Sequence, residues 1–100
     1  DRNPAVLSQH GVKTAICTDY NVMPIGLLPI CAGMAVREGM DYQQALAAIT
    51  IYPAQIVGID RRVGSLKVGK DADFAVFSQD PLTIAARPQL VVIGGKIVRR

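Results

Sequence analysis

The sequence predicts an α/β part at residues 1–60, followed by a smaller β part at residues 61–100. The first observation is a short apolar run, Val12–Cys17, between Gly11 and a polar cluster. Such a run is typical of a buried parallel strand. The second is a change of period, because helical patterns extend to about residue 59 and extended patterns follow.

The composition indicates a domain that needs a partner surface. Half of the 100 residues are hydrophobic, and this share does not count the nine glycines. A small domain has little interior in which to bury them. The net charge is +3, but the basic residues are scattered and there are only five aromatic residues. This pattern argues against nucleic-acid binding, which needs a basic stripe with stacking side chains.

Cys17 and Cys31 both lie in apolar runs. We expect them to be small core residues in a reducing, cytoplasmic compartment rather than a disulfide or a zinc site. No apolar run approaches the roughly 20 residues of a membrane span, so we expect no membrane partner. The chain opens on Asp1 without a signal-peptide pattern and without Met, which suggests a piece of a longer protein.

Two helices are expected on either side of the apolar run. Asn3-Pro4 has the form of a helix start, with Asn as the cap, and Ala5–His10 would form a short helix that Gly11 ends. His10 is the only histidine. At a helix end it is more typical of a residue favoured by the helix dipole than of a metal ligand.

After a loop at Tyr20–Ile25, the segment Ile25–Glu38 is expected to be helical and to end at Gly39. Its apolar residues surround nearly the whole circumference, as in a helix buried on several sides. A monomer of 100 residues can hardly provide such burial. Pro29 indicates either a kink or a helix that begins there.

The next helix has the clearest pattern. Asp41–Gln44 has capping-box spacing, with the Asp accepting from early backbone N–H groups and the Gln reaching back. Four side chains then share one face: Tyr42, Ala45, Leu46 and Ile49. Pro53 restarts a short helix over Ala54–Val57, which Gly58 ends.

The β part is expected to hold three or four strands, which is an incomplete sheet by itself. Residues 62–70 are rich in turn signals, and Asp73–Ser78 contains a continuous apolar strand. Gln89–Ile93 and Lys96–Arg99 flank Gly94-Gly95, which is a strong hairpin signal because both glycines tolerate positive φ.

Asp19 is the candidate functional residue, because ligands gather at the carboxyl ends of parallel strands. An acid there is a candidate catalytic group or metal ligand. The alternative is a turn or helix cap, which the pattern alone favours.

Seven segments occur in order along the chain. They are Gly11–Asp19, Ala35–Met40, Ala45–Ala54, Gly58–Asp60, Val63–Asp73, Asp80–Leu82 and Gly94–Val98. Together they resemble the C-terminal end of the amidohydrolase superfamily, in particular its imidazolonepropionase-like branch. The run Gly64–Asp73 is the most specific of them.

This resemblance implies a (β/α)₈, TIM-like barrel with a metal site at the carboxyl ends of its strands, beside a small β-sandwich. Residues 1–60 would be the end of the barrel, with Val12–Cys17 as its eighth strand. Residues 61–100 would be the C-terminal part of the sandwich. Asp19 matches the family's strand-end aspartate, which binds the catalytic metal and takes a proton from the attacking water. For the intact enzyme we therefore favour this catalytic role of Asp19 over the role of a turn or helix cap.

The family's other metal ligands are several histidines and often a carboxylated lysine. This chain holds only His10, in the helix before the strand, so we expect it to be a C-terminal fragment that is inactive alone. Tyr20 stands where relatives often carry His.

The resulting functional hypothesis is a metal-dependent hydrolase of C–N bonds other than peptide bonds. Its substrate would be a small molecule, and cyclic amides, dipeptides and deaminated heterocycles all stay open. The expected metal is divalent, with zinc favoured, and the expected partners are the missing N-terminal part of the enzyme and further copies of the chain. The alternative hypothesis is a non-catalytic assembly module or a separately encoded subunit.

Overall fold

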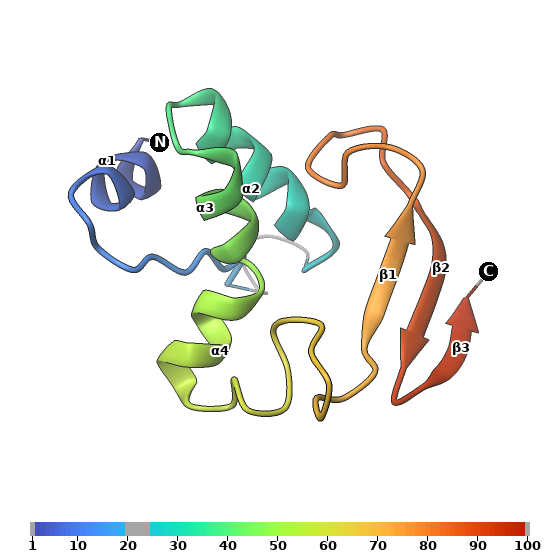
Figure 1. Ribbon diagram of the computed structural model, residues 1–100. Helices are drawn as coiled ribbons and strands as arrows, with labels where there is room; N and C mark the ends of the chain where they lie inside the picture. The colour runs from blue at the N-terminus through green and yellow to red at the C-terminus, as the bar shows by residue number, and fades with distance from the viewer. Residues whose placement is uncertain (1, 20–24, 100) are drawn as a thin grey trace.

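The computed structural model describes residues 2–19 and 25–99. Its elements, in order, are α1 (Asn3–Gln9), the 3₁₀ helix η1 (Ile25–Leu27), α2 (Leu28–Arg37), α3 (Tyr42–Ala47), α4 (Ile51–Val57), β1 (Phe74–Phe77), β2 (Pro88–Ile93) and β3 (Lys96–Arg99). The helices form one side of the molecule and the sheet forms the other (Figure 1). Tyr20, and with it most of the predicted loop Tyr20–Ile25, lies outside the described residues. None of the described helices has the length and apolar character that crossing a membrane requires.

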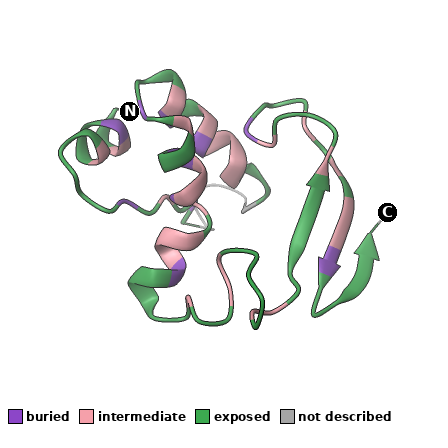
Figure 2. Ribbon diagram, in the orientation of Figure 1, coloured by how far each residue is buried: buried purple, intermediate pink, exposed green. Residues whose placement is uncertain are grey.

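The helical side packs around small side chains. The buried cluster consists of Ala5, Ala32, Ala35, Met40, Ala45, Ala48 and Leu82. Because most of these side chains end at Cβ, the helix backbones can approach closely, and α2 contacts both α1 and α3. Figure 2 shows buried positions as isolated purple segments on the helices, the connections and β2, with the rest of the chain intermediate or exposed. The core is therefore thin and built from alanine.

The first two predicted helices begin at slightly different residues. α1 begins at Asn3 itself, with Arg2 at the cap position, so the predicted Asn3 cap is wrong by one residue. α2 begins at Leu28, which places Pro29 in the first turn. Proline is tolerated there because that N–H has no partner inside the helix. Of the two readings of Pro29, the helix start is the one that is confirmed.

The described residues do not bury the predicted helix 25–38 on several sides, as we expect for so small a chain. Only Ala32 and Ala35 of α2 are buried, and Met34 is 53% exposed. α1 and α3 pack against α2, and the Leu82 backbone approaches it at Gly33, while the rest of α2 is half-buried or exposed.

The start and the buried face of α3 are confirmed. The Asp41 carboxylate accepts a hydrogen bond from the backbone N–H of Gln44 at 3.1 Å. The Gln44 side chain does not reach back as predicted, because its carbonyl oxygen accepts from the Tyr52 hydroxyl at 2.9 Å. The predicted face carries the buried Ala45, with Tyr42 and its other members packed against the alanine cluster.

α4 begins at Ile51, earlier than predicted, and includes Pro53 in its first turn. The same tolerance of proline near a helix start explains the difference. Gly58 ends the helix in the left-handed conformation, with φ of 83°, as predicted. Position C′ commonly needs this φ, and only glycine adopts it without strain.

The β part forms an antiparallel sheet with the order β1-β2-β3. β1 pairs with β2 in a register that places Phe74 opposite Val92, and β2 pairs with β3 so that Ile93 faces Lys96. The predicted hairpin is confirmed, because Gly94 and Gly95 form its turn with φ of 58° and 79°. Three strands are described, the lower of the two predicted numbers.

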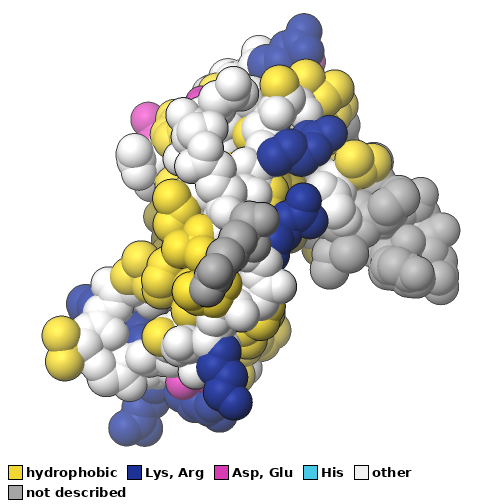
Figure 3. All heavy atoms as spheres, turned by 90° about the vertical axis from the view of Figure 1, so that its right-hand side faces the viewer, with side chains coloured by type: hydrophobic (Ala, Val, Ile, Leu, Met, Phe, Trp, Pro, Cys, Tyr) yellow, Lys and Arg dark blue, Asp and Glu magenta, His cyan; other side chains and the backbone are white. Residues whose placement is uncertain are grey.

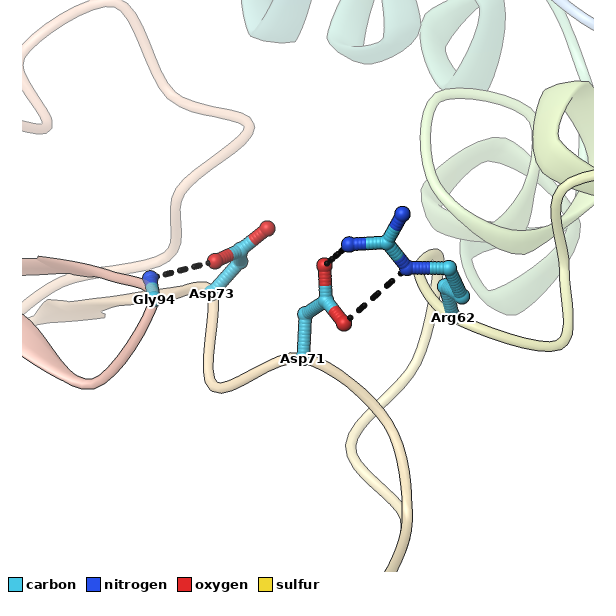
Figure 4. A network of polar contacts seen from close by, with 4 residues as sticks. All are labelled: Arg62, Asp71, Asp73 and Gly94. Atoms are coloured by element: carbon cyan, nitrogen blue, oxygen red, sulfur yellow. Dashed lines mark hydrogen bonds and ion pairs between the residues drawn. The ribbon is translucent and has the colours of Figure 1, made fainter.

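Hydrogen bonds from side chains fix the connection from α4 to β1, as Figure 4 shows. Arg62 makes an ion pair with Asp71 at 2.9 Å and donates a second bond to it at 3.3 Å. Asp73 accepts from the backbone N–H of Gly94 in the hairpin turn at 2.7 Å. These contacts tie the turn-rich segment to the sheet at the start of β1.

Candidate functional site

The predicted strand Val12–Cys17 is extended but forms no ladder with any described residue. A strand is defined by its pairing, and the described part of the chain supplies no neighbouring strand. Two described main-chain bonds join it to the helical side: the N–H of Val12 donates to the carbonyl oxygen of Leu7 in α1 at 3.0 Å, and the N–H of Ile16 donates to that of Ala48, just after α3, at 2.9 Å. The strand assignment is therefore corrected to an extended segment that lies on the helices.

The segment nevertheless keeps the two-residue alternation of a strand. Thr14 and Thr18 are buried, and Ile16 between them packs against the alanine cluster. The intervening residues are exposed: Lys13, Ala15, Cys17 and Asp19. Of these, Lys13 contacts the helical side, because its Nζ lies 5.8 Å from the centre of the Tyr52 ring in α4. One face is thus fixed by the helices, and the other is uncovered.

Asp19 ends this uncovered face. Its φ is 52°, and it is the only non-glycine residue with positive φ in the described part of the chain. Asp is among the few residues that adopt the left-handed region readily. The residue before it, Thr18, is 9% exposed, which anchors the backbone on one side of the carboxylate. The side chain of Asp19 is exposed and follows directly from a fixed segment.

The structure does not bring other metal-ligating residues to Asp19. Among residues 2–19 and 25–99, no three His, Cys, Asp or Glu side chains form a group that could hold a metal ion. His10 follows the last turn of α1, as predicted, and its Nδ1 lies 2.9 Å from the carbonyl oxygen of Val6. The candidate site of this chain is therefore a single carboxylate.

Cys17 and Cys31 form no disulfide. Cys31 is half-buried in α2, but Cys17 is exposed, so its expected place in the core is wrong. Cys17 belongs to the uncovered face of residues 12–19, and the described residues place nothing over that face to bury it.

Sequence reasoning missed a polar contact between the helices and the β1–β2 connection. The Tyr42 hydroxyl donates a hydrogen bond to the Asp80 carboxylate at 2.7 Å. This bond raises the pKa of Tyr42, and burial and the charge of Asp80 add to the effect. The backbone N–H of Leu82 and the Tyr42 hydroxyl lower the pKa of Asp80. The two residues are 38 positions apart, so no local pattern could have paired them.

An apolar groove of about 570 Å³ lies between α4, the turn that follows it and the start of β1. Pro53, Ala54, Val57, Leu66 and Phe74 line it, with the Asp73 carboxylate as its one charged side chain. A single charge that already accepts from Gly94 gives the groove no evident chemistry.

Comparisons with known proteins agree on one family. A profile of the amidohydrolase family matches residues 3–98. An imidazolonepropionase of Pseudomonas fluorescens is 39% identical over 77 residues, which are 74% of this chain and 19% of that protein. The amidohydrolase tasK of Hapsidospora irregularis is 33% identical over 90 residues, which are 90% of this chain and 9% of that protein.

The fold is also that of a solved relative. The crystal structure of an amidohydrolase from Thermotoga maritima matches with a TM-score of 0.92 and 35% identity, over 99% of this chain and 26% of that one. This chain thus spans about a quarter or less of the length of these relatives. Because the family profile covers nearly the whole sequence and the structural match agrees with it, this chain belongs to the amidohydrolase family.

Proposed function

We propose that this chain forms the C-terminal end of a hydrolase of C–N bonds other than peptide bonds, in which Asp19 is a catalytic residue. The observation that carries the proposal is the placement of Asp19 within the family match. It ends the uncovered face of a segment whose other face is fixed on the helices. In this proposal residues 1–60 are the end of a TIM-like barrel and residues 61–100 belong to a β-sandwich.

Amidohydrolases are generally metal-dependent. The described residues do not complete a metal site, because a hydrolytic site takes about three protein ligands and no group of three is found among them. In the proposal Asp19 supplies one carboxylate to a divalent metal, with zinc favoured, and the rest of the polypeptide supplies the other ligands. The chain alone is then inactive.

The chemistry assigned to Asp19 is proton transfer. An exposed carboxylate on a fixed backbone can accept a proton from an attacking water and return it to the leaving nitrogen. The exposed position of Asp19 and the anchoring of Thr18 support this role. The substrate class is a small cyclic amide or a related heterocycle, which the imidazolonepropionase relatives support. A reducing, cytoplasmic compartment belongs to the same proposal.

The test replaces Asp19 by Asn in the longest protein that the gene encodes. Asp19→Asn keeps the size of the side chain and removes the base, so we expect kcat to fall about a hundredfold or more, the scale of lost general-base catalysis. Folding should be preserved, because the segment and the alanine cluster are unchanged. The measurements are kcat, metal content and melting temperature.

Glu38→Gln is the matched control, because it removes an exposed carboxylate beside the end of α2. It should leave kcat at the wild-type value. Near wild-type turnover in metal-loaded Asp19→Asn protein would mean that Asp19 is only a turn or helix cap and not the catalytic base. If the encoded protein binds no metal and hydrolyses no such substrate, the assembly-module hypothesis replaces the proposal.

A further inference from the structure

We propose that the Asp80-Pro81-Leu82 turn holds the sheet against the helical side by packing Leu82 into the alanine cluster. In this proposal the hydrogen bond from Tyr42 of α3 to Asp80 keeps the turn in place. We call residues 80–82 the plug. The turn lies in the connection between β1 and β2, which Figure 1 shows reaching back toward the helices. The proposal goes beyond the hydrolase function and does not depend on it.

Leu82 is the part of the plug that enters the helical side. It is 8% exposed and belongs to the same buried cluster as Ala32 and Ala35 of α2. It is also the only member of that cluster from the part of the chain after α4. In a core built from alanine, one leucine from the β part contributes a large share of the apolar contact.

Gly33 of α2 admits the backbone of the plug. A Cβ built at Gly33 would overlap the carbonyl oxygen of Leu82. Glycine in a helix interior is disfavoured relative to alanine, so its presence there needs a packing reason. The close approach of the Leu82 backbone supplies that reason.

The Tyr42–Asp80 hydrogen bond joins the plug to α3. One carboxylate oxygen of Asp80 accepts from the Tyr42 hydroxyl at 2.7 Å and from the backbone N–H of Leu82 at 3.0 Å. The same oxygen therefore shapes the turn and joins it to α3.

The test measures amide hydrogen exchange in the 100-residue chain. Gly33→Ala should accelerate exchange of the Leu82 and Thr83 amides, which donate to Asp80, by about tenfold or more, because the added methyl expels the plug. Exchange of the Ala45 amide within α3 should not change. Gly26→Ala is the matched control, because a Cβ at Gly26 meets nothing within 4 Å.

A second pair of variants tests the Tyr42–Asp80 hydrogen bond. Tyr42→Phe should accelerate exchange at Leu82 by about threefold or more. Tyr52→Phe removes a similar hydroxyl bond within the helical side and should leave Leu82 unchanged. Wild-type exchange at Leu82 in both Gly33→Ala and Tyr42→Phe overturns the proposal. If Gly33→Ala unfolds the whole chain, Tyr42→Phe decides by itself, and an unchanged Leu82 amide overturns the plug.

Discussion

Tyr42 and Asp80 share one hydrogen bond, and it displaces their pKa values in opposite directions. The bond to Asp80 is the main cause that raises the pKa of Tyr42 above its ordinary 10.0. The Leu82 N–H, followed by the Tyr42 hydroxyl, lowers the pKa of Asp80 below its ordinary 3.8. The contribution to stability is therefore complete between these two ordinary values. It is lost as the pH rises through the raised pKa of Tyr42 or falls through the lowered pKa of Asp80.

We expect Tyr42→Phe to remove the alkaline loss that belongs to this pair. The phenylalanine has no proton to lose, so the difference in melting temperature between wild type and variant should shrink as the pH rises above 10.0. The effect is small because both groups lie at the surface. Melting temperatures of wild type, Tyr42→Phe and the control Tyr52→Phe at pH 7 and above pH 10 check it. A constant difference across the alkaline range would contradict the assignment.

A comparison of Gly64 and Gly69 distinguishes two causes of destabilisation by an added methyl group: backbone strain and steric overlap. Both have positive φ, of 100° and 96°. A Cβ at Gly64 would lie 2.8 Å from the Cβ of Ala54 and 3.1 Å from the Cα of Ile51, whereas a Cβ at Gly69 meets nothing within 4 Å. Gly64→Ala should therefore destabilise the chain by about 1–3 kcal/mol more than Gly69→Ala, the scale of overpacking. Urea unfolding of both variants gives the difference, and equal losses would show that only φ matters.

At the scale of elements, α3 depends on its cap. Asp41 holds the N–H of Gln44, and α3 in turn holds residues 12–19 through Ala48 and Ile16. Asp41→Ala should cost about 1 kcal/mol, the typical loss of an N-cap. Asp41→Asn keeps the acceptor and should be nearly neutral. Urea unfolding measures both, and a loss in Asp41→Asn as large as in Asp41→Ala would mean that charge, not the hydrogen bond, is responsible.

Elements that depend on local signals could be predicted, and those that depend on distant partners could not. The Asp41 cap and the Gly94-Gly95 turn are decided by residues a few positions apart, and both are confirmed. The segment Val12–Cys17 has the composition and alternation of a strand, but pairing requires other strands, and the described chain provides none. Cys17 is exposed for the same reason, because no described strand lies beside the segment.

In the candidate site, too, some features could be predicted from local signals and others depend on residues far apart in the sequence. Asp19 could be singled out because strand-end position and family resemblance both point to it, and its place on the uncovered face agrees with that choice. Its role in catalysis stays a prediction. The Tyr42–Asp80 contact could not be found, because it depends on the plug packing against α2 and α3. Such packing depends on the whole fold, so no periodic pattern in the sequence indicates it.

At the scale of the whole molecule, apolar surface exceeds what the described chain buries. No large side chain is fully buried in the described part, while Val57, Leu66, Ile84 and Val68 are among the large apolar residues that are exposed. Figure 3 shows hydrophobic side chains gathered on the face that carries the sheet. β1, an edge strand, is uncharged, whereas β3 carries Lys96 and Arg99 at its ends. Charges protect an edge from pairing with another chain, so β1 is the more open of the two edges.

We therefore expect the 100-residue chain to self-associate at concentrations on the order of tens of micromolar, with β1 as the contact. Val76 of β1 is 42% exposed and Val98 of β3 is 57% exposed, which makes them matched positions on the two edges. Val76→Lys places a charge on the open edge and should shift the chain toward monomer, because pairing would have to bury that charge. Val98→Lys adds the same charge to an edge that is already basic and should change the association much less. Light scattering gives the mass of each, and a monomeric wild type at this concentration, or equal shifts in both variants, would exclude the β1 edge as the contact.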